Sequence, residues 1–305
     1  MKSSFLQIKK QVINKGLLSR LLIYAILIGI GFVYLYPIIY MIVNSLFSLN
    51  DLIDPRVKWI PTGIYLNNFK EAFYTLDFIK SFSTSLLMSG IPALLQTTST
   101  ALIGFGMARF NFPIKRLWFI LIISTFLLPT QIMLVPRYAL FDSYNMINTV
   151  WPQFLPAIFG QGLRSAIFIL VFYQYFNSYP VAFDEAAELD GAGKFKVFTS
   201  IAMPMAGGAI VLSLLFSFVW YWNETYQSNL LFGSVLKTLP LQLQRFTAIY
   251  ESIYGGSTTG GATGTINESI TLAGTLLSIL PVVVLYVLLQ NKLVQGIEQT
   301  GVTGE

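Results

Sequence analysis

Long stretches of this chain carry neither acidic nor basic residues, and they recur along most of its length. Five of these stretches are at least 20 residues long: 21–50, 81–108, 117–136, 197–223 and 269–291. Because a helix needs roughly 20 apolar residues to cross the hydrocarbon core of a bilayer, each stretch predicts a membrane-spanning helix. A sixth candidate, 153–175, is interrupted by a single charge, Arg164.

The pattern therefore predicts an all-α integral membrane protein with six transmembrane helices. We place its transmembrane domain over residues 21–291, after a basic leader at 1–20 and before a C-terminal tail at 292–305. The predicted spans cover about 21–47, 81–106, 117–136, 153–175, 203–223 and 269–290. The first apolar stretch is too long for the apolar region of a secretion signal and lacks a small-residue cleavage site, so we interpret it as a retained helix.

Lysine and arginine residues near the ends of the spans indicate the orientation in the membrane. The leader carries five basic residues, and the short loop after the second span carries Arg109, Lys115 and Arg116. Because basic residues favour the cytoplasmic side, we expect both segments to be cytoplasmic. Six spans would return the C-terminus to the cytoplasm as well, which describes a multi-pass protein of a bacterial cytoplasmic membrane.

The composition agrees with a lipid environment and excludes several kinds of chemistry. Of the 305 residues, 54% are apolar and 11% are charged, whereas soluble domains carry about 25% charged residues; the mean hydropathy is +0.65. The absence of histidine and cysteine excludes disulfides, thiol nucleophiles, imidazole bases and Cys/His metal sites. The net charge of +5 does not indicate nucleic acid, because the basic residues lie beside apolar segments and not in one patch.

Acidic residues are scarce in this chain, yet four of them lie within residues 184–190, directly before Gly191 and Gly193. They belong to the loop 181–204, which we expect on the cytoplasmic side between the fourth and fifth spans. A proline at 180 favours the start of a helix, and the glycines favour its end. Phe195 and Phe198 follow at i, i+3 spacing, so the pattern predicts two short cytoplasmic helices that fit a groove on another protein.

The order of residues in this loop carries a more specific indication. The matching positions are Glu185, Ala186, Ala187, Gly191, Ile201, Met203 and Pro204. Their spacing resembles the coupling-loop (EAA) signature of ABC-importer permeases, with Met203 in place of the usual leucine. In that family the loop docks into a cleft of the cytoplasmic ATPase and transmits its closure to the membrane helices. The resemblance implies ATPase-coupling roles for Glu185, Ala186, Ala187, Asp190, Gly191, Phe195 and Pro204; an ordinary solvated acidic loop is the alternative.

Further stretches resemble carbohydrate permeases of the MalG type. They are residues 129–131 with Pro136, residues 148–149, residues 222–224, residues 238–243, and Gln290, Gly296, Ile297, Gly301, Val302 and Gly304 in the tail. In that family the C-terminal tail reaches between the two ATPase subunits, which implies contacts for Gly301 and Gly304, with a frayed terminus as the alternative. Thr303 stands where the family usually has a lysine, so one electrostatic contact of the tail is left in doubt.

Polar residues within or beside the spans are candidates for a substrate pathway, because sugars bind to aromatic faces and paired hydrogen-bonding groups. The candidates are Gln131, Arg164, Trp222, Asn223 and Glu224. For the aromatic cluster at the end of the fifth span, the alternative is an interfacial belt. For Arg164, the alternative is a side chain that snorkels to the outer interface.

Other classes of membrane protein fit the sequence less well. Ion-coupled carriers generally place ionisable residues at the midplane, whereas five of the predicted spans have none. A membrane enzyme would lack an evident nucleophile and base, and a channel would not need an acidic docking loop. The chain has no phosphate-binding loop of the G-x-x-x-x-G-K type, so we expect no cofactor on this chain and place ATP and Mg on a partner.

We therefore predict a permease subunit, not itself an enzyme, of an ATP-driven ABC importer for an oligosaccharide or related carbohydrate. The expected partners are a second permease of the MalF type, an ATPase dimer, an external solute-binding protein and the carbohydrate. An amino acid or phosphate ester is the alternative cargo within this mechanism. An ion-coupled secondary transporter is the alternative outside it.

Overall fold

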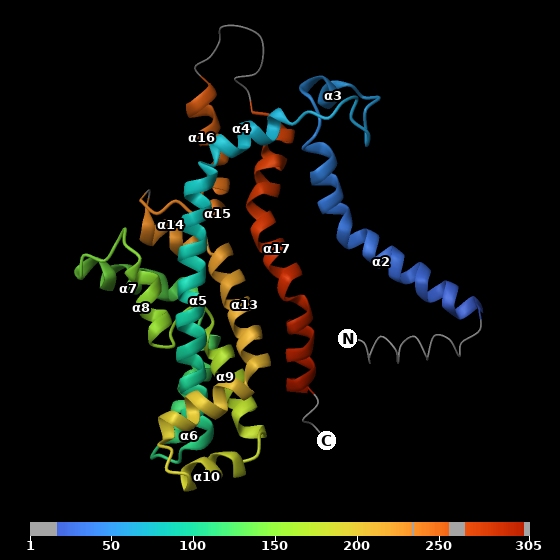
Figure 1. Ribbon diagram of the computed structural model, residues 1–305. Coiled ribbons are helices and arrows are strands. Elements are labelled where there is room, and N and C mark those ends of the chain that lie inside the picture. Colours follow the sequence, from blue (N-terminus) through green and yellow to red (C-terminus); the bar gives the residue numbers. More distant parts are fainter. Residues whose placement is uncertain (1–16, 234, 256–265, 302–305) are drawn as a thin grey trace. The chain divides into compact units, whose positions relative to one another are not determined.

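The computed structural model describes residues 17–233, 235–255 and 266–301, and every regular element over these ranges is a helix (Figure 1). This confirms the all-α class. Three of the helices are long and apolar enough to cross a membrane: α2 (Leu17–Asn44), α5 (Phe78–Arg109) and α17 (Glu268–Gly301). Each contains one internal proline, at Pro37, Pro92 and Pro281 respectively.

The other apolar segments are broken by sharp bends. α6 (Lys115–Leu127) and α7 (Thr130–Ser143) meet at 100°, and α9 (Ser165–Ser178) and α10 (Ala182–Leu189) at 75°. The segment Lys194–Met205 meets α13 (Gly207–Asn223) at 81°. By length and composition alone, the described residues therefore provide three spans, or up to six if each bent pair is one span.

Three of the predicted span ranges differ from the observed helices, and one of them, 203–223, contains the 81° bend between Met205 and Gly207. The range 117–136 is broken after α6, where Leu128 is extended (ψ 124°), because the residue before a proline is pushed out of the helical region. The range 153–175 contains most of α8 (Trp151–Ile158) and most of α9. Between these helices Gly160 and Arg164 have φ of +68° and +53°, and such left-handed residues interrupt a right-handed helix.

The chain divides into two compact units, and the first comprises residues up to 79 together with 242–284. It contains α2, α3 (Leu49–Ile53), α4 (Asn67–Thr75), α16 (Phe246–Tyr254) and the start of α17. Side-chain hydrogen bonds connect these elements: Asn68 Nδ2 donates to the carbonyls of Ser45 and Phe47, both at 2.8 Å. The Tyr250 hydroxyl donates to Glu71 at 2.8 Å.

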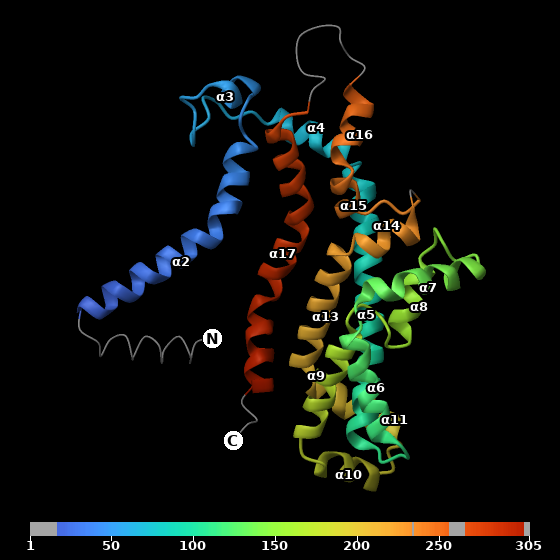
Figure 2. The ribbon, with the colours of Figure 1, turned by 180° about the vertical axis from the view of Figure 1, so that it is seen from behind.

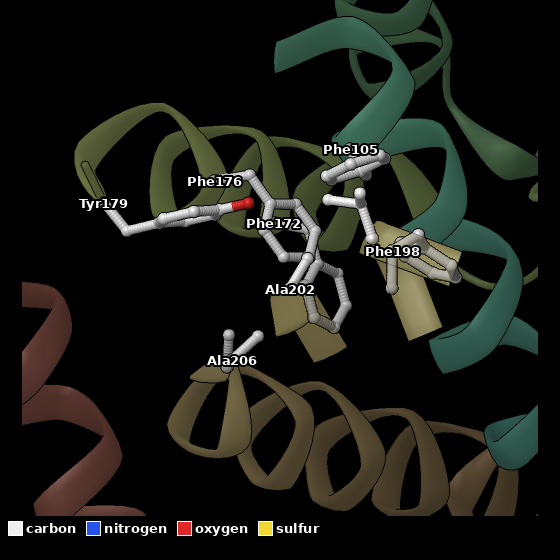
Figure 3. Close-up of a cluster of buried hydrophobic side chains, with 10 residues drawn as sticks. Phe105, Phe172, Phe176, Tyr179, Phe198, Ala202 and Ala206 are labelled. Atoms are coloured by element: carbon white, nitrogen blue, oxygen red, sulfur yellow. The ribbon is translucent and has the colours of Figure 1, made fainter. Parts of the chain in front are cut away.

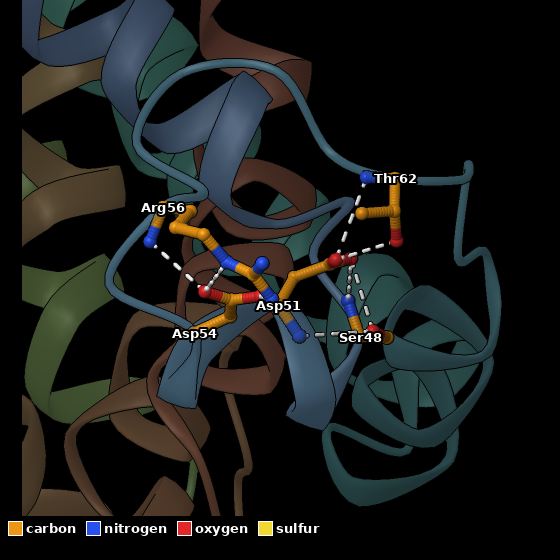
Figure 4. A network of polar contacts seen from close by, with 5 residues as sticks. All are labelled: Ser48, Asp51, Asp54, Arg56 and Thr62. Carbon is orange, nitrogen blue, oxygen red and sulfur yellow. Dashed lines mark hydrogen bonds and ion pairs between the residues drawn. The ribbon is translucent and has the colours of Figure 1, made fainter.

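Asp51 organises the loop that follows α2, as Figure 4 shows. Its buried carboxylate accepts hydrogen bonds from the Thr62 hydroxyl at 2.6 Å, from the Ser48 hydroxyl at 2.9 Å and from the Ser48 N–H at 3.1 Å. These donors, above all the Thr62 hydroxyl, hold the pKa of the Asp51 carboxyl below its ordinary value because they stabilise its charged form. The same side chain thereby caps α3 and closes the loop from 48 to 62.

The second unit comprises residues 80–241 and the chain from 285 onward. Within it α5, α9 and α13 run side by side, and α10 lies across their end in both views (Figures 1 and 2). α5 and α9 approach closely at Gly104, where an added Cβ would lie 2.6 Å from the Phe172 Cβ. This crossing therefore requires glycine.

A cluster of buried aromatic and alanine side chains fills the end of this unit next to α10 (Figure 3). Phe105 from α5, Phe172 and Phe176 from α9, and Phe198 from the segment after α10 pack in this cluster. The Phe105 ring meets the Phe176 ring edge-on at 5.4 Å, and the Phe198 ring lies 5.2 Å from Phe105. The bent segment between α10 and α13 is therefore anchored on the same core as α5 and α9.

Candidate functional site

The loop 181–204 folds as a helix, a glycine turn and a second short helix. α10 ends at Leu189, and α11 (Lys194–Val197) continues into a π-helical turn at Phe198–Ala202 and then α12 (Met203–Met205). At the turn, the N–H of Ala192 donates to the carbonyl of Ala187 at 2.9 Å, and that of Gly191 donates to Glu188 at 3.0 Å. With Gly191 at φ +83°, this is the Schellman arrangement that ends helices in a left-handed residue.

Six of the seven residues predicted to couple to an ATPase are exposed on this loop. They are Glu185, Ala186, Asp190, Gly191, Phe195 and Pro204. Phe195 exposes 70% of its surface, and its neighbour across the turn, Leu189, exposes 89%. Ala187 differs, because it packs partly buried against the aromatic core cluster. The end of α10 and its glycine turn thus present a surface on which acidic side chains lie beside the apolar side chains of Leu189 and Phe195.

The four acids of this loop have three different environments in the structure. Glu185 and Asp190 are exposed and have no ion pair among the described residues. Glu188 pairs with Lys194 across the turn. Asp184 is buried within the protein. The expectation that the acids face a partner can therefore apply to Glu185 and Asp190, but not to Asp184.

Asp184 forms a buried ion pair with Arg109, the last residue of α5, at 3.0 Å. Both side chains are about nine-tenths buried. The Asp184 carboxylate also accepts a hydrogen bond from the Tyr179 hydroxyl at 2.5 Å, and Arg109 donates to the Tyr179 carbonyl at 2.8 Å. The Arg109 guanidinium lies 4.0 Å from the centre of the Tyr179 ring. Three residues thus fix the first turn of α10 to the end of α5.

This cluster was not predicted as a site. In the sequence, Arg109 indicated only the membrane orientation, and it is separated from Asp184 by 75 positions. A possible indication was present in the sequence: an arginine that directly follows an apolar span has a side chain long enough to reach a carboxylate in another cytoplasmic loop. Nothing in the sequence selected Asp184 among the four acids.

Two of the candidate pathway residues, Gln131 and Arg164, line one cavity of about 520 Å³. Gln131 lies in the first turn of α7, directly after the bend that follows α6, and Arg164 lies directly before α9. Arg137, Gln161 and Gln227 also line this cavity. Arg137 was not predicted as a pathway residue, because it falls just outside the charge-free stretch that ends at residue 136.

A buried polar network holds the loop that forms one wall of this cavity. Gln96 from α5 donates to the Leu163 carbonyl at 2.8 Å and accepts from the Tyr221 hydroxyl at 2.6 Å. The Tyr221 oxygen in turn accepts from the Leu163 N–H at 3.2 Å. A Cβ at Gly162 would lie 2.2 Å from both side-chain oxygens. Only glycine therefore fits at this position without displacing Gln96 and Tyr221.

The remaining pathway candidates lie apart from the larger cavity. Trp222 is buried, stacks on Phe218 at 5.6 Å between ring centres and meets Phe82 edge-on, so it is a core residue and not an interfacial belt residue. Asn223 is exposed and donates to the carbonyl of Val219. Glu224 accepts from the N–H of Gln227 at 2.7 Å and lines a smaller neighbouring cavity of about 20 Å³.

Only one of the two glycines predicted to contact the ATPase through the tail lies among the described residues. Gly301 is the last residue of α17, and Gly304 lies outside the described residues. Among the described residues, no group of three or more His, Cys, Asp or Glu side chains could hold a metal ion.

Comparisons with known proteins agree on one family. The family described as "Binding-protein-dependent transport system inner membrane component" matches residues 100–299. The "Probable ABC transporter permease protein YurM" of Bacillus subtilis (strain 168) is 26% identical over 272 residues, 88% of this chain and 84% of the relative. The "Melibiose/raffinose/stachyose import permease protein MelC" of the same organism is 28% identical over 260 residues, 84% and 88% of the two chains.

Two further similarities extend this result. The "Probable starch degradation products transport system permease protein AmyC" of Thermoanaerobacterium thermosulfurigenes is 24% identical over 271 residues, 88% of this chain and 92% of the relative. A chain from the crystal structure of a bacterial ABC transporter that imports the acidic polysaccharide alginate superposes with a TM-score of 0.71. It is 19% identical and covers 91% of this chain and 98% of the solved chain, a likeness that shows a shared fold.

Proposed function

The chain belongs to the family of binding-protein-dependent transport system inner membrane components, and from this we propose that it is one of two permease subunits of an ATP-driven carbohydrate importer. The names of MelC and AmyC, which specify oligosaccharides and starch products, support a carbohydrate cargo. The proposed topology has six spans with both termini in the cytoplasm. In it, each bent pair of helices contributes to one crossing and α10 lies on the cytoplasmic face.

The exposed surface on α10 and its glycine turn carries the proposal. An ATPase that closes on ATP would contact Glu185, Asp190 and Phe195 and displace α10. Because the Arg109–Asp184 pair fixes α10 to α5, the displacement would reach α5 directly. Phe198 and the segment leading to α13 pack on the same core, so α13 would move with it. This movement would switch the spans between inward- and outward-facing arrangements.

The other subunits would supply what this chain lacks. ATP and Mg would bind to an ATPase dimer, and the tail around Gly301 and Gly304 would contact that dimer. A second permease would complete the membrane pathway, and an external solute-binding protein would deliver the carbohydrate. This chain would therefore convert ATPase closure into movement without catalysing a reaction.

The decisive experiment is ATP hydrolysis by the complete complex in proteoliposomes. The complex of this chain, its second permease and its ATPase is mixed with the binding protein and a panel of oligosaccharides, amino acids and phosphate esters. We expect hydrolysis to rise severalfold with the binding protein loaded with an oligosaccharide. Stimulation by an amino acid or phosphate ester alone would contradict the carbohydrate cargo. Uptake that continues without ATP in an ion gradient would contradict the whole mechanism.

A further inference from the structure

The 520 Å³ cavity lined by Gln131 and Arg164 is positively charged. Arg137 and Arg164 both line it, and none of its lining residues is acidic. Among the described residues, no carboxylate lies within 4 Å of either guanidinium. Glu224 shares a neighbouring cavity with Arg137 but does not pair with it. Unpaired ionisable groups within a membrane domain are costly and mark substrate pathways.

Both arginines are held in place by contacts that leave their charge uncompensated. Arg137 Nη2 donates to the Gln161 carbonyl at 3.1 Å, and the Arg164 guanidinium lies 4.9 Å from the centre of the Trp220 ring. A guanidinium has five N–H donors, so each arginine keeps donors for a ligand.

The backbone at Arg164 gives an independent indication. Its φ of +53° lies in the left-handed region, which costs most residues about 1–2 kcal/mol and which glycine and asparagine adopt more readily. The backbone conformation at this position therefore favours glycine or asparagine over arginine. What an arginine adds at position 164 is its long charged side chain, which lines the cavity.

Neutral hydrogen-bonding groups complete the lining. The amides of Gln131, Gln161 and Gln227 and the hydroxyl of Thr130 surround the same space, and such groups bind sugar hydroxyls. The volume falls within the range of about 300–1,000 Å³ that is usual for small-molecule sites. The cavity thus combines donors for an anion with partners for hydroxyl groups.

We propose that this cavity binds an anionic carbohydrate, specifically an oligosaccharide that carries a carboxylate, as a uronic acid does. The guanidinium matches a carboxylate with two parallel N–H···O bonds, while the glutamine amides would bind the sugar hydroxyls. The inference rests on the proposed function, because it names the class of carbohydrate that passes this chain.

The test compares uptake of labelled trigalacturonate and of the neutral trisaccharide galactotriose by the complete complex in proteoliposomes. We expect uptake of trigalacturonate. Arg137→Gln and Arg164→Gln should each lower its kcat/KM by about tenfold, as expected for the loss of one charge-assisted hydrogen bond. Arg164→Lys should recover part of the loss, because it keeps the charge. Arg116→Gln, which removes an exposed charge elsewhere, is the matched control and should leave uptake unchanged.

Each other outcome overturns the inference in a recognisable way. Uptake of galactotriose without trigalacturonate would reject the anionic class and leave the proposed carbohydrate importer intact. Uptake of trigalacturonate that is indifferent to both arginine substitutions would reject this cavity as the site. Uptake of neither sugar, together with uptake of a non-carbohydrate, would reject the proposed cargo itself. Co-purification of all subunits with each variant shows that a loss of uptake does not reflect failed assembly.

Discussion

At Gly191 the constraint lies in the backbone and not in the surroundings. Its φ is +83°, and an added Cβ would meet no atom within 4 Å in this chain. The left-handed conformation is needed because the Gly191 and Ala192 N–H groups bond back to the last turn of α10. The free space around Gly191 is what a docking partner would use.

A pair of substitutions of similar size separates these two requirements. Gly191→Asn should leave uptake close to the wild-type rate, because asparagine adopts left-handed conformations. Gly191→Val should destabilise the turn by about 1–2 kcal/mol and reduce uptake by the reconstituted complex severalfold. Equal and severe losses with both variants would show instead that a partner fills the space around Gly191. Normal uptake with Gly191→Val would contradict any coupling role for this turn.

At the scale of elements, the connection between α5 and α10 depends on one buried ion pair. Removing one partner of such a pair leaves an uncompensated buried charge and costs about 3–5 kcal/mol, whereas replacing both partners with apolar residues is often neutral. Unlike an apolar contact, the pair also fixes the orientation of α10 relative to α5. Arg109 bonds both to the Asp184 carboxylate and to the Tyr179 carbonyl.

We therefore expect Arg109→Met to lower the Tm of the complex and to abolish stimulation of ATP hydrolysis by the loaded binding protein. The double variant Arg109→Met with Asp184→Leu should restore the Tm but not the stimulation. Arg56→Gln breaks an ion pair in which Arg56 is 89% exposed, and it serves as the control that changes neither quantity, since exposed pairs contribute about 0–1 kcal/mol. Full stimulation in the double variant would show that Arg109 and Asp184 act only through stability.

At the scale of the whole molecule, the proposed topology predicts on which side of the membrane each loop lies, and cysteine labelling can test this. The chain contains no cysteine, so single-cysteine variants can be labelled without background. Lys58→Cys and Tyr144→Cys should react with a membrane-impermeant maleimide in intact cells. Asn111→Cys and Thr199→Cys should react only after lysis. All four positions are exposed, so a missing reaction reports the membrane side and not burial. Labelling of Asn111→Cys in intact cells would overturn the orientation derived from the basic residues.

Features that depend on neighbours in sequence were predictable. The helical class follows from long apolar stretches, and the glycine turn of residues 187–192 follows from a local pattern, because its hydrogen bonds join residues no more than five positions apart. Glu185 and Phe195 are exposed, and their contact with an ATPase stays a prediction. The bend after Leu128 was also encoded locally, by the proline at 129, but the unbroken run of uncharged residues concealed it.

Tertiary structure decided which polar groups meet. The sequence by itself determined that this chain is helical, that most of it is apolar enough for lipid, and that one acidic loop carries the family motif, since these properties come from composition and short-range order. Only the fold showed that Asp184 faces inward to Arg109, that Trp222 is a core residue, and that Arg137 and Arg164 line one cavity. Arg109 and Asp184 lie 75 positions apart, Arg137 and Arg164 lie 27 apart, and Trp222 lies 140 positions from Phe82. These encounters depend on how α5, α7, α9, α10 and α13 pack, which no local pattern specifies.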